Sequence, residues 1–140
     1  MLSTDITVYS KNNAFVVPVE ITDKIILMEF DTGAVNTVIS AELVFKEMSE
    51  LQRSTLRDHC SKHCSPVILK SASGHKILGY PVITKNVLID GVIIPILRYY
   101  MVIDRLFDDC KIALLGNDII RYCKFLHEIN GNIKITVIAH

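Results

Sequence analysis

The sequence lacks a net charge, a signal-like N-terminus and any apolar run long enough to cross a membrane. Fifteen lysines and arginines balance fifteen aspartates and glutamates, which argues against a nucleic-acid-binding face or a polybasic membrane patch. The first residues, Met1–Asp5, contain neither a basic nor an apolar segment, so we expect no secretory signal. The apolar run Val92–Leu97 stops at Arg98 and is far shorter than a bilayer requires.

In the absence of a signal, the four cysteines are expected to be reduced thiols of a cytoplasmic protein. Half of the residues are hydrophobic and the mean hydropathy is +0.36, so the chain should fold rather than remain disordered. Its 140 residues suit one domain with a single core, and we assign residues 1–140 to that domain.

Asp31 lies at the centre of the most informative stretch, Ile25–Ser40. An apolar run leads into Asp-Thr-Gly-Ala, and a second run containing Val38 and Ile39 leads out. The pattern predicts a buried strand that delivers a carboxylate to its end, followed by a tight turn for which Gly33 is suited. Because a buried acid is costly unless it is paired or used, Asp31 is the candidate functional residue. A plain turn, capped by the aspartate, is the alternative explanation.

This stretch resembles the active-site segment of the retropepsin-like aspartic proteases, the short group that includes the retroviral enzymes. The resemblance covers about residues 15–137. It implies an all-β, retropepsin-like half-barrel with one or two short helices, assembled as a two-fold homodimer. It also implies an aspartic endopeptidase, with Asp31 as the catalytic acid and Thr32, Gly33 and Ala34 as the active-site loop.

The second half of the same signature lies in Lys111–Ile120, where two large aliphatic residues and a glycine precede a short helix. The resemblance implies that Leu114, Leu115 and Gly116 form a wall beside the Asp-Thr-Gly loop, with the glycine permitting a close approach. We expect Asn117 to cap the helix that follows.

Between the two motifs, residues 67–80 predict a hairpin with a tip of small residues. In the resemblance this hairpin is the flap, which closes over a bound peptide and therefore needs a tip that can move and approach the peptide backbone. An ordinary exposed hairpin is the alternative. The expected tip consists of Ser71, Ala72, Ser73 and Gly74.

Elsewhere the pattern predicts a helix over much of 41–58, beginning after Ser40. Pro18 indicates an edge or irregular position within a strand, and Pro95 interrupts a long strand that follows a turn at Asp90-Gly91. The terminal strand 133–138, which follows a turn at Asn130-Gly131, is apolar. It should be an exposed edge unless something pairs with it, and in the resemblance the terminal strands build the dimer interface.

One carboxyl is not enough for the implied chemistry. Peptide hydrolysis by aspartic proteases needs one group to accept a proton from water and another to donate one to the carbonyl oxygen. Two adjacent carboxyls share a proton and fill both roles. The chain has a single Asp-(Thr/Ser)-Gly, so a second copy must supply the partner across a two-fold axis. We therefore expect a homodimer that acts on peptides or proteins, without a metal, another cofactor, nucleic acid or a membrane, in which Thr32 reaches across the axis to the opposite loop.

The sequence departs from the resemblance at four positions. Ala34 stands where many aspartic proteases carry a serine or threonine. Val35 and Asn36 stand where retroviral enzymes often carry two acids that grip the substrate backbone, and Asn117 replaces their basic partner. These changes leave the substrate contacts open. The rival functions are a catalytically silent dimeric module that binds peptides by β-augmentation, and a regulatory protease domain that is active only within a longer precursor.

A cluster of cysteines and histidines forms the other candidate site. Thiolate and imidazole suit zinc, but the spacing is not the usual Cys-x-x-Cys pair and the two groups are far apart in the sequence. Metal binding therefore remains an alternative to packed or solvent-facing thiols. The residues concerned are His59, Cys60, His63, Cys64, Cys123 and His127.

Overall fold

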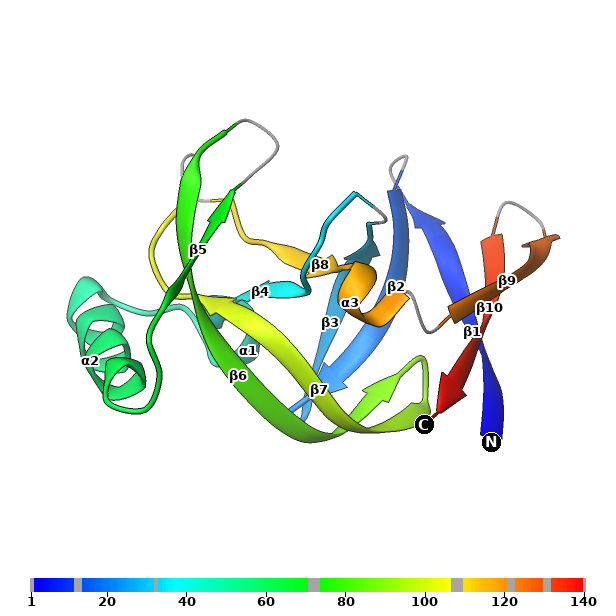
Figure 1. The fold of residues 1–140 in the computed structure, drawn as a ribbon, viewed down its shortest axis with the longest axis horizontal. Coiled ribbons are helices and arrows are strands. Elements are labelled where there is room, and N and C mark those ends of the chain that lie inside the picture. Colours follow the sequence, from blue (N-terminus) through cyan, green and yellow to red (C-terminus); the bar gives the residue numbers. More distant parts are fainter. Residues whose placement is uncertain are drawn as a thin grey trace.

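The computed structural model describes residues 2–11, 14–31, 33–70, 74–106, 110–120, 123–129 and 132–139. The protein is mostly β (Figure 1), as the sequence predicted. Its strands are β1 (Leu2–Lys11), β2 (Ala14–Ile21), β3 (Lys24–Phe30), β4 (Val38–Ser40), β5 (Val67–Lys70), β6 (Lys76–Ile89), β7 (Val92–Val102), β8 (Ala113–Leu115), β9 (Cys123–Ile129) and β10 (Asn132–Ala139). The helices in the described ranges are α1 (Ala41–Val44), α2 (Glu50–Ser61) and α3 (Asn117–Ile120). None of them is long and apolar enough to cross a membrane.

The strands form one sheet in the order β5-β6-β7-β4-β8-β3-β2-β1-β10-β9. A further antiparallel pairing joins Val19 and Glu20 of β2 to Ile89 and Leu88 of β6. That pairing closes β6, β7, β4, β8, β3 and β2 into a barrel. The hairpin strand β5 is then an extension on one side, and β1, β10 and β9 are an extension on the other.

The core fills the barrel through the alternation of side chains along its strands. In β3 the side chains of Ile26, Met28 and Phe30 are buried, whereas the intervening positions, including Leu27 and Glu29, are exposed. The two faces of β3 therefore differ in chemistry. One supports the core, and the other is free to carry functional groups.

Pro18 lies where β2 changes its neighbour, which accounts for the irregular position predicted there. Before it, Val16 pairs with Tyr9 of β1, and after it, Val19 pairs with Ile89 of β6. The carbonyl oxygen of Pro18 accepts a hydrogen bond from the backbone N–H of Asp90 (2.8 Å). A residue without an N–H is tolerated at such a change of partner.

Pro95 does not interrupt its strand, contrary to the sequence prediction. Strand β7 runs from Val92 to Val102, and its pairing with β6 omits only the position at which Pro95 faces Asn86. Asn86 has a positive φ of 59°, so the backbone of β6 absorbs the irregularity. The predicted turn at Asp90-Gly91 is confirmed, with positive φ at both residues.

The helix predicted over 41–58 is divided into α1 and α2, so the described residues contain three helices rather than one or two. The division arises at Ser49, whose hydroxyl accepts a hydrogen bond from the backbone N–H of Gln52 (3.2 Å) while the Gln52 side chain accepts one from the Ser49 N–H (2.8 Å). This capping box starts a new helix. Ser40 does precede α1, but its hydroxyl accepts from the N–H of Ile112 (2.8 Å) instead of capping the helix.

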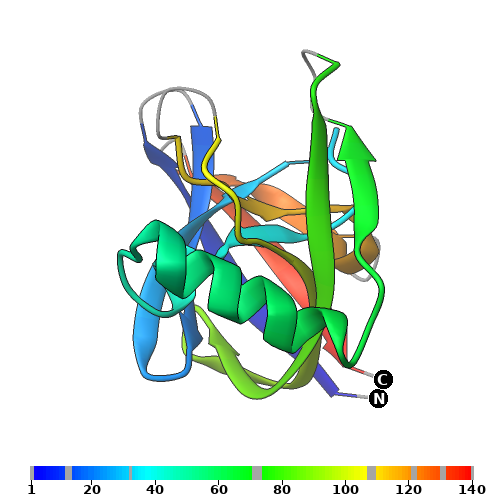
Figure 2. The same ribbon diagram turned by 90° about the vertical axis from the view of Figure 1, so that its left-hand side faces the viewer.

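Helix α2 is fixed to the barrel by a buried arginine. The Arg53 side chain is 2% exposed, forms an ion pair with Glu42, and donates to the carbonyl oxygens of Ile103 (2.9 Å) and Met48 (3.3 Å). A buried guanidinium is tolerated only with such partners. The helix lies in front of the barrel in Figure 2, at the end of the molecule opposite the terminal strands (Figure 1).

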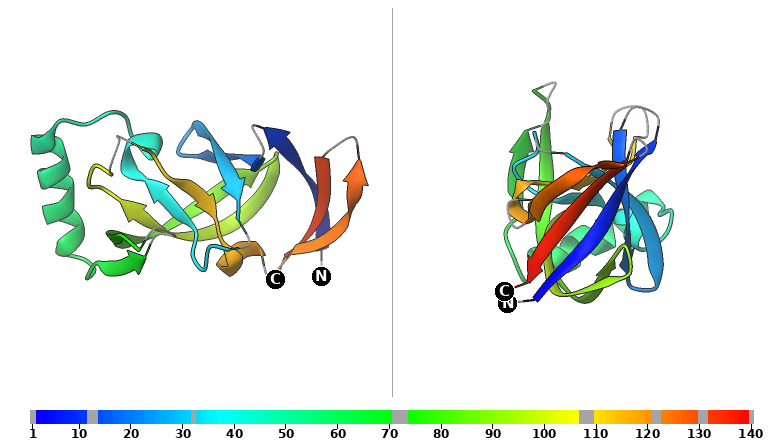
Figure 3. Two further views of the ribbon diagram at one scale, coloured as in Figure 1. Left: turned by 90° about the horizontal axis from the view of Figure 1, so that it is seen from above. Right: turned by 90° about the vertical axis from the view of Figure 1, so that its right-hand side faces the viewer.

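The terminal strand β10 is paired on both sides, so the exception that the sequence analysis allowed is the case that the structure shows. It pairs along its length with β1, from Leu2–Ala139 to Val8–Ile133, and with β9 on its other side. The two chain ends therefore lie side by side (Figure 3). The outermost strand at this end is β9, and the turn at Asn130-Gly131 lies outside the described residues.

Candidate active site

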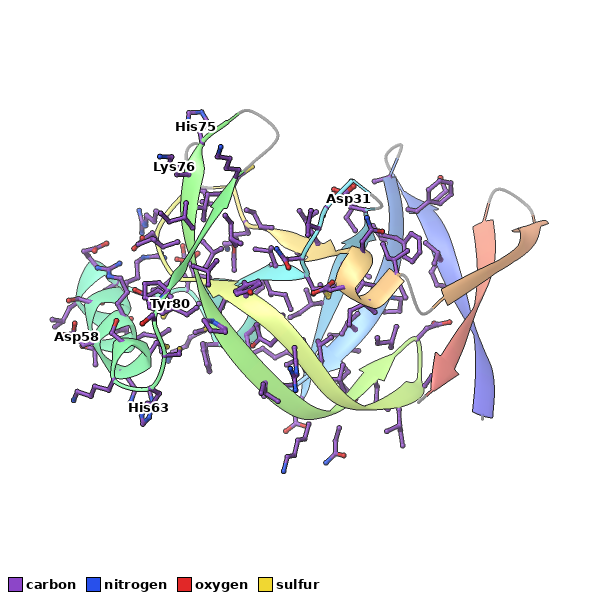
Figure 4. All side chains as sticks on the ribbon, viewed as in Figure 1. Asp31, Asp58, His63, His75, Lys76 and Tyr80 are labelled. Atoms are coloured by element: carbon purple, nitrogen blue, oxygen red, sulfur yellow. The ribbon has the colours of Figure 1, made fainter. Side chains whose placement is uncertain are left out.

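Asp31 directly follows β3, in the position that the sequence predicted. Its backbone N–H donates to the carbonyl oxygen of Leu115 (3.1 Å), which extends the parallel pairing of Glu29 and Phe30 with Leu114 and Leu115 of β8. The pairing of the backbone with β8 thus continues as far as Asp31 itself. Its side chain is partly buried and lies on the side of the molecule toward which the 67–80 hairpin extends (Figure 4).

The turn after Asp31 orients the carboxylate. The N–H of Gly33 donates to Asp31 Oδ1 (2.8 Å), and the N–H of Ala34 donates to the Asp31 carbonyl oxygen (3.2 Å). A Cβ at Gly33 would lie 3.2 Å from Oδ1, so glycine leaves room for the acid. No described residue donates to Oδ2. The structure does not describe Thr32.

The loop 33–37 packs against the turn that joins β8 to α3. A Cβ at Gly116 would lie 2.4 Å from the backbone C and O atoms of Asn36, so only glycine permits this approach. The N–H groups of Asn117 and Asp118 donate to the carbonyl oxygens of Ala34 (2.8 Å) and Val35 (3.2 Å). The two sequence motifs, about eighty residues apart, therefore form one interlocked unit.

The three residues expected to form a wall beside the loop take different positions. Leu114 is half-buried and pairs with Glu29 on one side and Val38 on the other. Leu115 points into the core and is 1% exposed.

Asn117, which the sequence predicted to cap the helix, is instead the first residue of α3. The carbonyl oxygen of Gly116 accepts from the N–H groups of Ile119 (3.0 Å) and Ile120 (2.9 Å), so Gly116 takes the position before the helix.

A hydrogen-bond network behind the loop was missed by the sequence analysis. Thr37 is fully buried, and it donates to both oxygens of the Asp118 carboxylate, through its N–H to Oδ2 (2.9 Å) and through Oγ1 to Oδ1 (2.7 Å). Oγ1 also accepts from the N–H of Gly116 (3.1 Å). The only available signals were a threonine in an apolar strand and an acid at the start of a helix, both of which need partners when buried.

The 67–80 hairpin is present and is formed by β5 and the start of β6, with pairs from Val67–Gly79 to Lys70–Lys76. Gly74 is exposed, with φ +84°, and a Cβ added there would meet no atom within 4 Å. A Cβ at Gly79 would lie 2.7 Å from Leu69 Cδ1 and 3.0 Å from Tyr100 Cβ, so the base of the hairpin is packed against β7. The expected tip residues Ser71, Ala72 and Ser73 lie outside the described residues.

The cysteines and histidines do not form one site. Cys60, His63 and Cys64 lie at the end of α2, whereas Cys123 and His127 belong to β9 at the opposite end of the molecule (Figure 1). Within the described ranges no group of three or more potential ligands could hold a metal ion. Burial raises the pKa of the Cys60 thiol, with a smaller contribution from Cys64, which favours the protonated thiol over the metal-binding thiolate.

Comparisons with known proteins identify the fold. No protein-family model matches the sequence, and no curated protein matches it. The structure is similar to the crystal structure of a retropepsin-like aspartic protease from Rickettsia conorii, with a TM-score of 0.60 and 16% sequence identity over 97% of this chain and 92% of that chain. The retropepsin-like fold class predicted from the sequence is therefore confirmed. At this identity the similarity identifies the fold alone, because function depends on the site.

The network behind the loop predicts a stability effect. Thr37→Val keeps the shape of the side chain but removes both hydrogen bonds of Oγ1, leaving an Asp118 oxygen and the Gly116 N–H without this partner. We expect the free energy of unfolding to fall by about 1–3 kcal/mol, measured by urea denaturation. Thr55→Val is the matched control, because the exposed Thr55 hydroxyl donates only to a carbonyl of its own helix and its loss should change stability by less than about 0.5 kcal/mol. Equal effects of the two substitutions would contradict a special role for Thr37.

Proposed function

We propose that this protein is an aspartic endopeptidase, in which two Asp31 carboxyls from the two copies of a homodimer activate a water molecule to hydrolyse a peptide bond. The observation that carries the proposal is the presentation of Asp31. It lies at the end of a strand in a retropepsin-like fold, in a loop locked by Gly116 and by the amides of α3. Fixed placement of a reacting group is what catalysis by a carboxyl pair requires.

The arrangement of the carboxylate supports a partner in trans. Gly33 engages Oδ1, whereas Oδ2 accepts no hydrogen bond from any described residue. We infer that the second Asp31 approaches this side, so that the pair holds one proton between two carboxyls that cannot both ionise. Water then gives a proton to the charged carboxyl as its oxygen bonds to the peptide carbon. The protonated carboxyl gives its proton to the carbonyl oxygen. The first carboxyl then passes its proton to the nitrogen as the C–N bond breaks, while the second takes a proton from one hydroxyl of the tetrahedral carbon, which leaves the new acid, the amine and a pair that again holds one proton.

Other residues have supporting roles in this proposal. Thr32 would bond to the opposite loop, and Gly33 would let the two chains approach. The flap, with its tip at residues 71–74, would close over the substrate, and Leu114 would contribute apolar surface beside the acid. The protein would need no metal ion or other cofactor, since the carboxyl pair supplies both proton-transfer roles.

The first test removes the acid. Asp31→Asn keeps the size of the side chain but cannot share a proton or act as a base, so we expect cleavage of a peptide library to be lost, by at least about a thousandfold, while folding and dimerisation persist. Asp58→Asn is the matched control, because Asp58 is exposed on α2 at the far end of the molecule (Figure 4). The Asp58→Asn protein should cleave peptides like the wild type. Cleavage near the wild-type level by Asp31→Asn would assign the activity elsewhere. Peptide binding by both forms without cleavage by either would favour the silent peptide-binding module.

The second test concerns assembly. A single Asp-Thr-Gly per chain predicts that activity follows the dimer population. Sedimentation velocity over a concentration series should show a monomer–dimer equilibrium, and the specific activity should fall as the protein is diluted below the dissociation constant. A monomer with full peptidase activity would contradict the shared site. A dimer that becomes active only when joined to further sequence would instead favour the precursor hypothesis.

The third test concerns Ala34, which has no hydroxyl to donate to the catalytic carboxylate. A donor at this position would stabilise the charged form, so that the pair would take up its second proton only at lower pH. Ala34→Ser should therefore move the acidic limb of the kcat/KM profile downward by roughly 0.5–1 pH unit, the equivalent of one hydrogen bond of about 1 kcal/mol. Ala34→Val, which adds bulk without a donor, is the control and should leave the limb in place. An unchanged or higher limb in a well-folded Ala34→Ser protein would refute this account.

A further inference from the structure

A second acid lies on the same face of the protein as Asp31. Glu29 precedes Asp31 by two residues, and the buried side chains of Met28 and Phe30 alternate with it. Because side chains alternate along a strand, Glu29 and Asp31 project to the same side, about 7 Å apart along the chain at roughly 3.3 Å per residue. Glu29 is exposed, and it is the one other acid in the segment 25–40.

The Glu29 carboxylate is unpaired among the described residues, and its neighbours in the sheet are apolar. Its neighbours in the sheet are Leu114 of β8 and Val16 of β2, both half-buried. No ion pair or hydrogen bond joins the Glu29 side chain to another residue in the part of the chain that the structure describes. The next exposed side chain on this face of β3 is Leu27, and in the loop after Asp31 the Val35 side chain is 74% exposed. None of these neighbours of Glu29 carries a charge.

We propose that Glu29 is a specificity-determining residue that selects substrates with a lysine or arginine beside the scissile bond. The inference rests on the proposed peptidase function and names the substrate class of the same site. A peptide that presents its scissile carbonyl to Asp31 runs extended past this face, so a side chain next to the bond comes within reach of Glu29. The aliphatic stem of a lysine or arginine lies along Leu114 while its charged head meets the carboxylate, as such amphipathic side chains require.

The competing explanation is that Glu29 is a solvated surface acid with no ligand. The two explanations differ in one measurable quantity, the ratio of rates for substrates that differ only in charge. Lysine and norleucine share the same aliphatic stem, and only lysine carries the ammonium group. Comparing them isolates the electrostatic contribution from the apolar one.

The experiment starts from any peptide that the wild-type protein cleaves in a library, resynthesised with lysine, norleucine or glutamate at each position flanking the cleaved bond. For one position we expect kcat/KM to be about fivefold higher for lysine than for norleucine, the effect of a partly exposed ion pair. Glu29→Gln should bring this ratio close to one, and Glu29→Lys should instead favour glutamate. The lysine preference should also weaken with added salt. Glu47→Gln, at an exposed acid between α1 and α2, is the control and should retain the wild-type ratio.

Failure of this inference is separable from failure of the proposed function. Cleavage without a basic preference, or a preference that survives Glu29→Gln, would overturn the role of Glu29 and leave the peptidase standing. If no peptide is cleaved, a library peptide that the Asp31→Asn protein binds is resynthesised with lysine or norleucine at each position in turn, and calorimetric titration of Asp31→Asn with these peptides decides the matter. Tighter binding of the lysine peptide that is lost in Asp31→Asn/Glu29→Gln supports the inference, and equal binding of the two peptides overturns it.

Discussion

The close approach of Gly116 to Asn36 is the constraint on which the candidate site depends. With no side chain at residue 116, the backbone of the β8–α3 turn reaches the loop and donates two N–H groups to it. The buried Thr37 and the carboxylate of Asp118 then tie the exit strand to the start of α3. A loop that carries an acid at a strand end would otherwise have few internal bonds. The polar network gives it the fixed geometry that a proton-sharing pair needs.

The sequence predicted the parts of the fold that have local signals. Asp31 after an apolar run, the turn at Asp90-Gly91 and the 67–80 hairpin all follow from residues a few positions apart. The break between α1 and α2 also had a local signal, Ser49-x-x-Gln52, but the helix-favouring residues around it obscured the capping box. The link between Thr37 and Asp118 had none, because 81 positions separate the two residues. Each lies in one of the two motifs, but neither motif says which side chains meet.

The pairing of the terminal strands is another contact between distant parts of the sequence that local signals did not predict. An apolar strand at a chain end predicts an edge or an interface, but the sequence does not say which strand covers it. The N-terminal β1 pairs with β10 within one chain, over seven positions from Leu2 to Val8, so the outermost strand is β9. A register shift in the pairing of β9 with β10, between Lys134 and Ile135, interrupts the regularity of this last strand, a feature that discourages unwanted edge pairing. An interface formed here would therefore join sheets in which β1, β10 and β9 are already paired within each chain.

The loop at Asp31 and the β5–β6 hairpin differ in how firmly they are held, as the proposed reaction requires. Asp31 is bounded by β8, by Gly33 and by the α3 turn, so its backbone and carboxylate are held from several directions. The hairpin strand β5 has a single partner, β6, and its side chains are mostly exposed. A strand with one partner and few buried contacts opens at low free energy. At the base of the hairpin, Gly79 lies close to the side chains of Leu69 and Tyr100, so this end is packed against β7. The same chain therefore combines a firmly held acid with a hairpin that has few buried contacts, which is the division that the proposed peptidase would use.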